Sequence, residues 1–327
     1  MLIGVTWEGS VLVGVMPCAV QRRFGLRLLQ WAAQFHSDYC DCLFDQAHID
    51  ALDTLWQIMS QAGGFDLINL QQVRPDAQCR PFLEARFGSQ EPGERQVRCL
   101  RIDNRWQSDH AFFRSLNKKM RNNHTRGKRI LSEHGGDVTF EVVEPGRPID
   151  DMLDTIVQWK LAWLRTADPT SPLFGREYPV FRALIDGAWK AGIAKLFLLT
   201  CGGKMCAASF NFVHRGKLQA YLTAYDRSYE RASPGTILIV EYAQWSFDRG
   251  LCVVDFLRGD EPFKFRLANA ETVISGFSGA RTLMGQVAHS GHRWLVRQRH
   301  RRDVVPSKAP ELEEVVALLH RSPAGSR

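Results

Sequence analysis

The residues from Arg231 to Thr236 combine hydroxyl groups, a cation and a glycine at the expected start of a helix. A helix start leaves backbone N–H groups unpaired and carries the positive end of the helix dipole, so it attracts anions. Gly235 would let a phosphate approach the backbone closely, and further contacts would come from Arg231, Ser233, Pro234 and Thr236. The pattern therefore indicates a diphosphate cradle. A structural helix that is merely capped by Ser-Pro-Gly is the alternative.

A second group of charged residues follows a short apolar strand. It comprises Asp255, Arg258, Asp260, Glu261 and Lys264. Functional sites gather at the ends of strands in open sheets. Asp260 is the first candidate for a general base on an acceptor amine or hydroxyl, Glu261 is the second, and Lys264 could bind an anion or stabilise developing charge. Asp255 is expected to brace the site by pairing with Arg258 or Lys264. A local network of ion pairs at a turn is the alternative.

Two basic segments are further candidates, because the net charge of +7 favours anionic partners. The first is a helix with cations at Arg114, Lys118, Lys119, Arg121, Arg126, Lys128 and Arg129. It lacks aromatic residues among its cations, so a solvated helix face is favoured over a nucleic-acid surface. The second is the tail from Arg293 to Arg302, which contains Trp294 and could touch a membrane surface. Its apolar face is short, which favours a plain surface helix.

The sequence lacks the signatures of several other enzyme classes. It contains no Walker A loop, GxSxG, HExxH or GxGxxG, which argues against NTPases, kinases and zinc hydrolases. The 8 cysteines form no CxxC, so we expect no metal site and reduced thiols in a cytoplasmic protein. No apolar run reaches ~18 residues, so no membrane span is expected.

The elements that position these residues divide into two halves, as expected for a chain of 327 residues. The first half should contain a hairpin of two strands (Leu2–Trp7 and Val11–Val20), a helix from Asp45 onward and a strand at Leu67–Leu70. The second half should contain a basic helix (Asp109–Glu133) and then a meander of three strands (Leu196–Cys201, Met205–Val213 and Leu218–Tyr225). A helix (Pro234–Arg249) and a last strand (Cys252–Leu257) should follow. We expect one lobe at 1–105, a catalytic lobe at 106–285 and a basic tail at 286–327.

Several short runs of residues point to one family. The most specific are Tyr225-Asp226, Ser233-Pro234-Gly235 and the run from Asp255 to Lys264, and the others are Ser115–Arg121, Lys160–Trp163 and Ala207–Phe210. Through these runs, the span from Asp109 to Phe277 resembles the acetyltransferase domain of the CelD-like (cellulose biosynthesis) branch of the GNAT superfamily. Gly14–Pro17 and Ser37–Tyr39 are similar to the less distinctive amino-terminal half of the same proteins. Such proteins are similar in turn to FemAB-type aminoacyl transferases.

The resemblance implies an α/β fold with two GNAT-like lobes, each with a mixed, largely antiparallel sheet flanked by helices. It implies acetyl-CoA or another acyl-CoA as the donor and an amine or hydroxyl as the acceptor, often in polysaccharide or envelope metabolism. It also implies that the strands Leu218–Tyr225 and Cys252–Leu257 lie side by side and part at their ends. Tyr221 or Tyr225 would then face Asp255 and the turn after it across a cleft.

The sequence departs from the family pattern at two points. The family usually has a further strand and helix before the first hairpin, so the first lobe could be incomplete. Phe263 stands where tyrosine is usual, which removes a hydroxyl from the site. The family's catalytic residues are not uniform, so the resemblance carries over a motif rather than a mechanism.

Three functions remain open at this point. The first is an acyl-CoA-dependent N- or O-acyltransferase, which CoA affinity would support. The second is a FemAB-type transferase that uses aminoacyl-tRNA, for which the basic helix would contact RNA in a salt-dependent manner. The third is a GNAT-like binding subunit without catalysis, which would show neither property.

Overall fold

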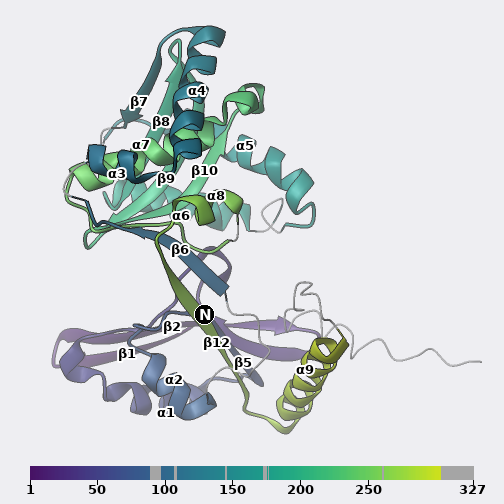
Figure 1. Cartoon of the computed structure of the whole chain (residues 1–327). Helices are drawn as coiled ribbons and strands as arrows, with labels where there is room; N and C mark the ends of the chain where they lie inside the picture. The colour runs from purple at the N-terminus through teal and green to yellow at the C-terminus, as the bar shows by residue number, and fades with distance from the viewer. Residues whose placement is uncertain are drawn as a thin grey trace, which may run out of the picture. The chain divides into compact units, whose positions relative to one another are not determined.

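The computed structural model describes residues 1–88, 97–106, 109–143, 146–171, 175, 177–259 and 261–302, with the backbone alone at 109, 110 and 296–302. The chain forms two compact units. Unit 1 comprises Met1–Arg98 together with the chain from Thr272 onward, and unit 2 comprises Cys99–Glu271 (Figure 1).

Unit 1 is built on a sheet with the strand order β1-β2-β3-β5-β12. The strands are β1 (Leu2–Glu8), β2 (Val11–Arg23), β3 (Leu26–Trp31), β5 (Leu67–Val73) and β12 (Ala270–Ala280), and β4 (Leu43–Phe44) pairs with β2. Among the described strands of this unit, β3 and β5 pair in parallel, while β1 with β2, β2 with β3 and β4, and β5 with β12 pair antiparallel. The predicted hairpin is present, because β1 and β2 pair antiparallel around a turn that Gly9 enters with a positive φ of 59°.

The two faces of this sheet carry different helices. On one face, α1 (Ala51–Ala62) and α2 (Arg80–Phe87) cover a core that includes Met16, Trp31 and Trp56. On the other face, α9 (Leu283–Arg302) covers a smaller core. The helix that we expected from Asp45 begins later, because Asp45 caps a short 3-10 helix, η2 (Gln46–His48), with its side chain.

Unit 2 is built on a sheet with the order β6-β11-β10-β9-β8-β7. The strands are β6 (Val97–Asp103), β7 (Val138–Val142), β8 (Ala194–Cys201), β9 (Lys204–His214), β10 (Lys217–Tyr225) and β11 (Val253–Asp255). The strands β8, β9 and β10 form the predicted antiparallel meander. β10 and β11 pair in parallel, as predicted, with the helix α7 (Pro234–Asp248) between them in the chain.

Helices cover both faces of the second sheet (Figure 1). On one face lie α3 (Asp109–Ser115), α4 (Lys118–Gly135) and α7, around a core that includes Phe112, Phe197 and Tyr242. On the other face lie α5 (Asp150–Ala167) and α6 (Tyr178–Lys190). A last short helix, α8 (Pro262–Leu267), follows β11.

The predicted basic helix is divided into α3 and α4. α3 ends at Ser115, and Asn117 caps the start of α4, because its side chain accepts a hydrogen bond from the Met120 N–H at 2.9 Å. The Arg121 guanidinium donates to the carbonyls of Arg114 and Leu116 at the end of α3. The sequence pattern had concealed this break, since cations run through both helices.

The boundaries between the two units differ from the domain boundaries that we expected after residues 105 and 285. β6 pairs with β11 as far as Asp103, and β12 pairs with β5 from Ser275 to Ala280. The division therefore falls at 98/99 and 271/272. The tail expected at 286–327 begins within α9, and residues 303–327 lie outside the described part of the chain. Among the described helices, none combines the length and apolar character needed to cross a bilayer.

Candidate functional site

The start of α7 presents unpaired hydrogen-bond donors. After β10, the 3-10 helix η4 (Arg227–Ala232) leads to Ser233, which adopts the left-handed conformation with φ 54° and ψ 53°. The Ser233 carbonyl accepts hydrogen bonds from the N–H groups of Thr236 at 3.0 Å and Ile237 at 3.2 Å. Its hydroxyl makes no capping hydrogen bond. Among the described residues, the Gly235 N–H also has no partner; Gly235 itself is buried, whereas Ser233 is exposed.

Two glycines fix the surroundings of this helix start. A Cβ at Gly127 of α4 would lie 2.5 Å from the Ala232 carbonyl oxygen and 2.9 Å from Cδ1 of Ile237. Glycine therefore allows α4 to press against the turn that precedes α7. A Cβ at Gly235 would lie 3.2 Å from Cδ1 of Tyr225, so the Tyr225 ring packs on the helix start itself. Arg231 is exposed at the end of η4.

A partly buried ion pair joins α4 to α7. Nζ of Lys128 lies 2.7 Å from Oε1 of Glu241, and Nε2 of His124 lies 3.0 Å from the same oxygen. Burial alone would raise the pKa of Glu241, but the hydrogen bonds and charges of His124 and Lys128 lower it overall. Glu241 is therefore held as a carboxylate. This contact and the one at Gly127 set the position of α7 relative to α4.

The two parallel strands of unit 2 part where the predicted cleft should lie. β10 and β11 pair only from Lys217 to Gln219 and from Val253 to Asp255. β10 continues to Tyr225, and within the described part of the chain it pairs there with β9 alone, on its other edge. Its register against β9 shifts between Gln219 and Leu222, which marks a β-bulge. The edge of β10 beyond Gln219 is therefore not used by β11, and the bulge reorients its backbone groups.

The turn after β11 encloses a lysine. Lys264 of α8 is buried, and its Nζ lies 2.9 Å from Oε2 of Glu261 and donates to the Arg258 carbonyl at 2.5 Å. Gly259, with a φ of 118°, makes room for this ammonium, because a Cβ there would lie 2.8 Å from Nζ. Asp255 is buried at the end of β11 and accepts a hydrogen bond from the Leu257 N–H at 2.8 Å.

The structure also shows an amine that sequence reasoning had not assigned a role. Lys160 of α5 places its Nζ 4.2 Å from the centre of the Trp163 ring. Burial lowers the pKa of Lys160, the charge of Glu261 raises it and that of Lys264 lowers it. Lys160 is thus electrostatically coupled to the turn after β11. The spacing of Lys160 and Trp163, one helical turn apart, was the available signal.

The predicted site residues therefore fall into two groups within unit 2. Tyr225 lies with Ser233, Pro234 and Gly235 at the start of α7, while Asp255, Arg258 and Lys264 lie at the turn after β11. Tyr221 packs against Phe212, with ring centres 5.0 Å apart, on the face that α6 covers. Asp260 lies outside the described residues. Phe263 packs edge-on against Phe256, a contact that needs no hydroxyl.

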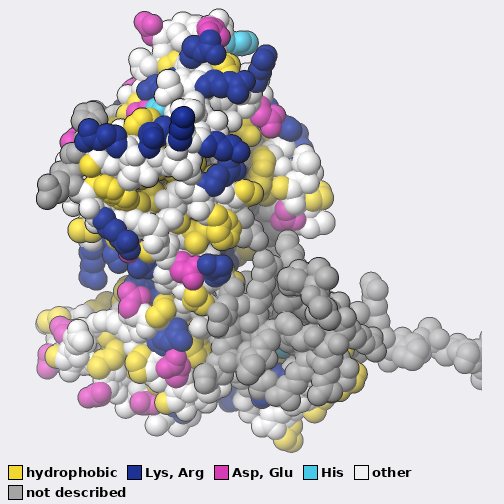
Figure 2. Space-filling model, in the orientation of Figure 1, with side chains coloured by type: hydrophobic (Ala, Val, Ile, Leu, Met, Phe, Trp, Pro, Cys, Tyr) yellow, Lys and Arg dark blue, Asp and Glu magenta, His cyan; other side chains and the backbone are white. Residues whose placement is uncertain are grey.

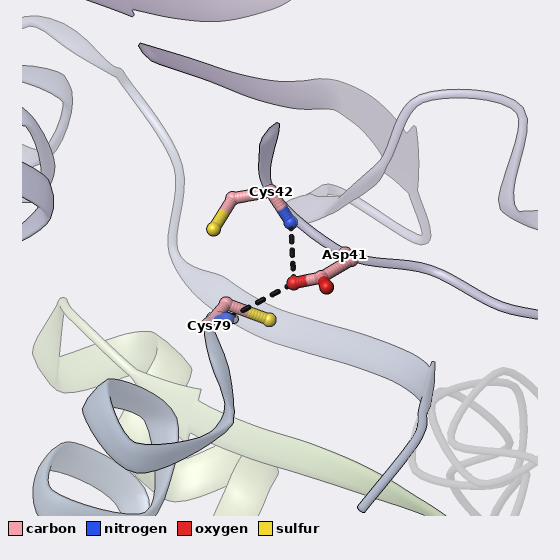
Figure 3. Close-up of side chains that lie close together, drawn as sticks. All are labelled: Asp41, Cys42 and Cys79. Atoms are coloured by element: carbon pink, nitrogen blue, oxygen red, sulfur yellow. Dashed lines mark hydrogen bonds between the residues drawn. The ribbon is translucent and has the colours of Figure 1, made fainter. Parts of the chain in front are cut away.

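A further cluster of reactive residue types lies in unit 1. Asp41, Cys42 and Cys79 place one oxygen and two sulfur atoms within 4.8 Å of one another (Figure 3). The Asp41 carboxylate accepts hydrogen bonds from the N–H groups of Cys42, Gln78 and Cys79 at 2.8, 2.8 and 2.9 Å. The hydrogen bond with Cys42 and then burial raise the pKa of Cys79. The carboxylate is thus engaged in tying residues 41 and 42 to the start of α2, and the Cys79 thiol is held in its neutral form.

Comparisons with known proteins agree with this architecture. Residues 118–265 match the family model described as an acetyltransferase (GNAT) domain. The carboxy-terminal domain of a protein from Agrobacterium fabrum assigned as a lysylphosphatidylglycerol synthetase has a TM-score of 0.54 and 14% identity, with 91% of this chain and 88% of that chain covered. FemX has a TM-score of 0.52 and 12% identity, with 88% of each chain covered. L-PGS from Bacillus licheniformis has a TM-score of 0.52 and 12% identity, with 90% and 88% covered. No curated protein matches the chain.

These similarities establish the fold. The residues that match the acetyltransferase (GNAT) domain model, 118–265, lie within unit 2. The predicted GNAT fold, a mixed sheet with flanking helices, is confirmed. At 12 to 14% identity, the similarity to these solved structures supports the fold alone.

Proposed function

We propose that the GNAT domain of this protein transfers an acyl group from acyl-CoA to an amine or hydroxyl, and that the start of α7 holds the CoA diphosphate. The observation that carries the proposal is the pair of donors left unpaired there, the Gly235 N–H and the Ser233 hydroxyl, at the positive end of a helix of 15 residues. Anions bind such helix starts through backbone N–H groups and the dipole. Arg231 and Thr236 flank the same turn and would add a charge and a hydroxyl.

The thioester would lie where β10 and β11 part. The edge of β10 beyond Gln219, which β11 does not pair with, would offer backbone groups to the amides of the pantetheine arm, much as a neighbouring strand would. The bulge between Gln219 and Leu222 would direct a backbone N–H toward the acyl carbonyl, where negative charge develops during transfer. Tyr225, packed against Gly235, would bound this space on the side of the diphosphate.

The transfer itself requires one proton acceptor. The acceptor nitrogen or oxygen forms a bond to the acyl carbon, the thioester C–S bond breaks, and CoA leaves as the thiolate or thiol. The proton of the acceptor passes to a base, for which Asp260 remains our first choice and Glu261 the second. Glu261 is already engaged in an ion pair with Lys264 at 2.9 Å, which is why it stays the second choice. Asp255 braces the turn through the Leu257 N–H.

An aminoacyl-tRNA donor is the second candidate, and one observation favours it. Exposed cations follow the surface of α3 and α4, where Figure 2 shows Lys and Arg side chains gathered. They are Arg114, Lys118, Lys119, Arg126 and Arg129. This surface adjoins the start of α7 through Gly127, so a longer polyanion could follow the same path as a diphosphate.

Calorimetry with acetyl-CoA on the full chain tests the proposal. Ser233→Gly removes the free hydroxyl and also relieves the left-handed conformation, which costs a non-glycine residue ~1 kcal/mol. We expect it to be slightly more stable than wild type and to bind acetyl-CoA ~10-fold more weakly, as befits one hydrogen bond to a charged group. Gly187→Ser in α6, where a Cβ meets nothing within 4 Å, is the control and should bind normally. Tight, salt-dependent tRNA binding without acetyl-CoA binding would instead support the second candidate.

A further inference from the structure

The helix α9 turns large apolar side chains toward solvent. Leu283 is 81% exposed, Met284 59%, Val287 75% and Trp294 60%. At 100° per residue, Leu283, Val287 and Trp294 project within about 40° of one another, so they form one stripe along the helix. The basic segment at 293–302 by itself had shown only the end of this stripe. The described helix carries it back to Leu283.

The opposite side of α9 is fixed to unit 1. Ala288 is buried against Leu26, Leu28 and Leu67, and His292 is buried beside them on the same helix face. A Cβ at Gly285 would lie 2.1 Å from the Asp66 carbonyl oxygen, so the helix touches the sheet there. The helix therefore cannot rotate its apolar stripe inward, because small residues and histidine already occupy the packed side.

Further apolar side chains are exposed on the same face of the sheet. In β1, the Cβ position of Gly4 faces Leu55 and Met59 of α1, so its odd-numbered neighbours face the other side, which is the side that α9 covers. Those neighbours include Ile3 and Val5, which precede the register shift after Thr6 and are both 45% exposed. The apolar surface of unit 1 thus includes both the stripe of α9 and the outer strand.

The charge of this segment is one-sided. From Thr272 to Arg302 the sequence contains no Asp or Glu and six arginines, at 281, 293, 297, 299, 301 and 302. An apolar stripe with an aromatic residue, beside a dense group of cations, complements a surface that is apolar within and anionic at its boundary. A bilayer that contains anionic lipids has this chemistry.

We propose that α9 binds the surface of an anionic lipid bilayer, with the stripe formed by Leu283, Val287 and Trp294 inserted at the boundary between headgroups and acyl chains. The helix lies in the membrane plane rather than across it. Neither contribution suffices alone, since apolar insertion and electrostatic attraction each give weak, reversible binding and act together. The proposal does not depend on the identity of the acyl donor.

Co-sedimentation of the full chain with vesicles tests the proposal. Wild type should sediment with vesicles of phosphatidylcholine and phosphatidylglycerol, and it should bind vesicles of phosphatidylcholine alone at least ~10-fold more weakly, with the difference shrinking as salt is raised. The double variant Val287→Asn, Trp294→Asn should lose ~10-fold or more of the binding to anionic vesicles, because two exposed apolar groups no longer insert. Ile58→Asn in α1, which replaces a side chain 56% exposed on the other face of the sheet, is the control and should bind as wild type does.

Four results would overturn the proposal. Wild type could stay in solution with both kinds of vesicle, or bind both equally. The double variant could bind as tightly as wild type and the Ile58 variant. Light scattering could also show that wild type self-associates through this stripe while the double variant is monomeric, in which case a second copy of the chain occupies it. The emission of Trp294 is obtained by subtracting the fluorescence spectrum of Trp294→Phe from that of wild type. A blue shift of this emission, seen only with anionic vesicles, would support insertion directly.

Discussion

Replacing Gly127 by alanine perturbs the candidate site without touching any group that would contact a ligand. The added Cβ would lie 2.5 Å from the Ala232 carbonyl oxygen, whereas comfortable non-bonded contacts are about 3.5 Å. The helix α4 and the turn before α7 must therefore separate by roughly 1 Å. The overlap should cost ~1–3 kcal/mol, which more than offsets the gain of ~1 kcal/mol from alanine in a helix.

Gly187→Ala provides the matched control, because it makes the same exchange in the interior of α6, where the new Cβ meets nothing within 4 Å. It should gain up to ~1 kcal/mol in unfolding free energy, and it should bind acetyl-CoA as wild type does. Gly127→Ala should be ~1–3 kcal/mol less stable than this control and bind acetyl-CoA ~10-fold more weakly, since misplacement by about 1 Å is costly for an oriented site. Urea titrations and calorimetry on both variants measure these quantities.

Two results would refute this reasoning. If Gly127→Ala is as stable as Gly187→Ala, the close approach of α4 to the turn before α7 is not a real constraint. If it is destabilised but binds acetyl-CoA with wild-type affinity, the contact matters for folding and does not position the ligand.

Three further predictions concern single carboxylates. Hydrogen bonds from Arg27 lower the pKa of Asp66 to about 2, so the contribution of Asp66 to stability is present above pH ~4 and is lost as the pH falls toward 2. Urea titrations should show this loss in wild type and not in Asp66→Asn, and parallel curves of unfolding free energy against pH for the two proteins would contradict it. Asp41→Ala should lower the unfolding free energy by ~1–3 kcal/mol, because three backbone N–H groups lose their acceptor, and an unchanged melting temperature would count against this role. Asp260→Asn should reduce turnover ~10²–10⁴-fold with acetyl-CoA affinity unchanged, and a variant of full rate would move the role of base to Glu261 or to water.

The sequence predicted those features of the site that local patterns determine. Ser-Pro-Gly after a strand and turn placed the start of α7 correctly, and the alternation from Leu218 to Tyr225 identified the meander. The parallel pairing of β10 and β11 followed from the handedness of the crossover between them. These inferences need only a short window of sequence and the general geometry of α/β folds.

The features that the sequence concealed depend on contacts between distant residues. Gly127 looks like a weak position in a basic helix until Ala232 is placed against it. Lys160 belongs to a different helix from Glu261 and Lys264, and only the folded chain couples their charges. The outward apolar stripe of α9 becomes visible only when the packed side of that helix is known, because periodicity alone does not tell which side faces the core.

The central claim is that the start of α7 recognises the diphosphate of acyl-CoA. The most direct test compares the affinities of the full chain for acetyl-CoA and for S-acetylpantetheine, which lacks the diphosphate together with the adenosine 3′-phosphate attached to it. We expect wild type to prefer acetyl-CoA by ~100-fold or more, since each hydrogen bond to a charged group contributes ~1.5–3 kcal/mol. Gly235→Asp, which places a carboxylate at the helix start, should bring the two affinities within about threefold of each other, because like charges repel there. A preference that is equally large in a folded Gly235→Asp variant, or absent in wild type, would contradict the account.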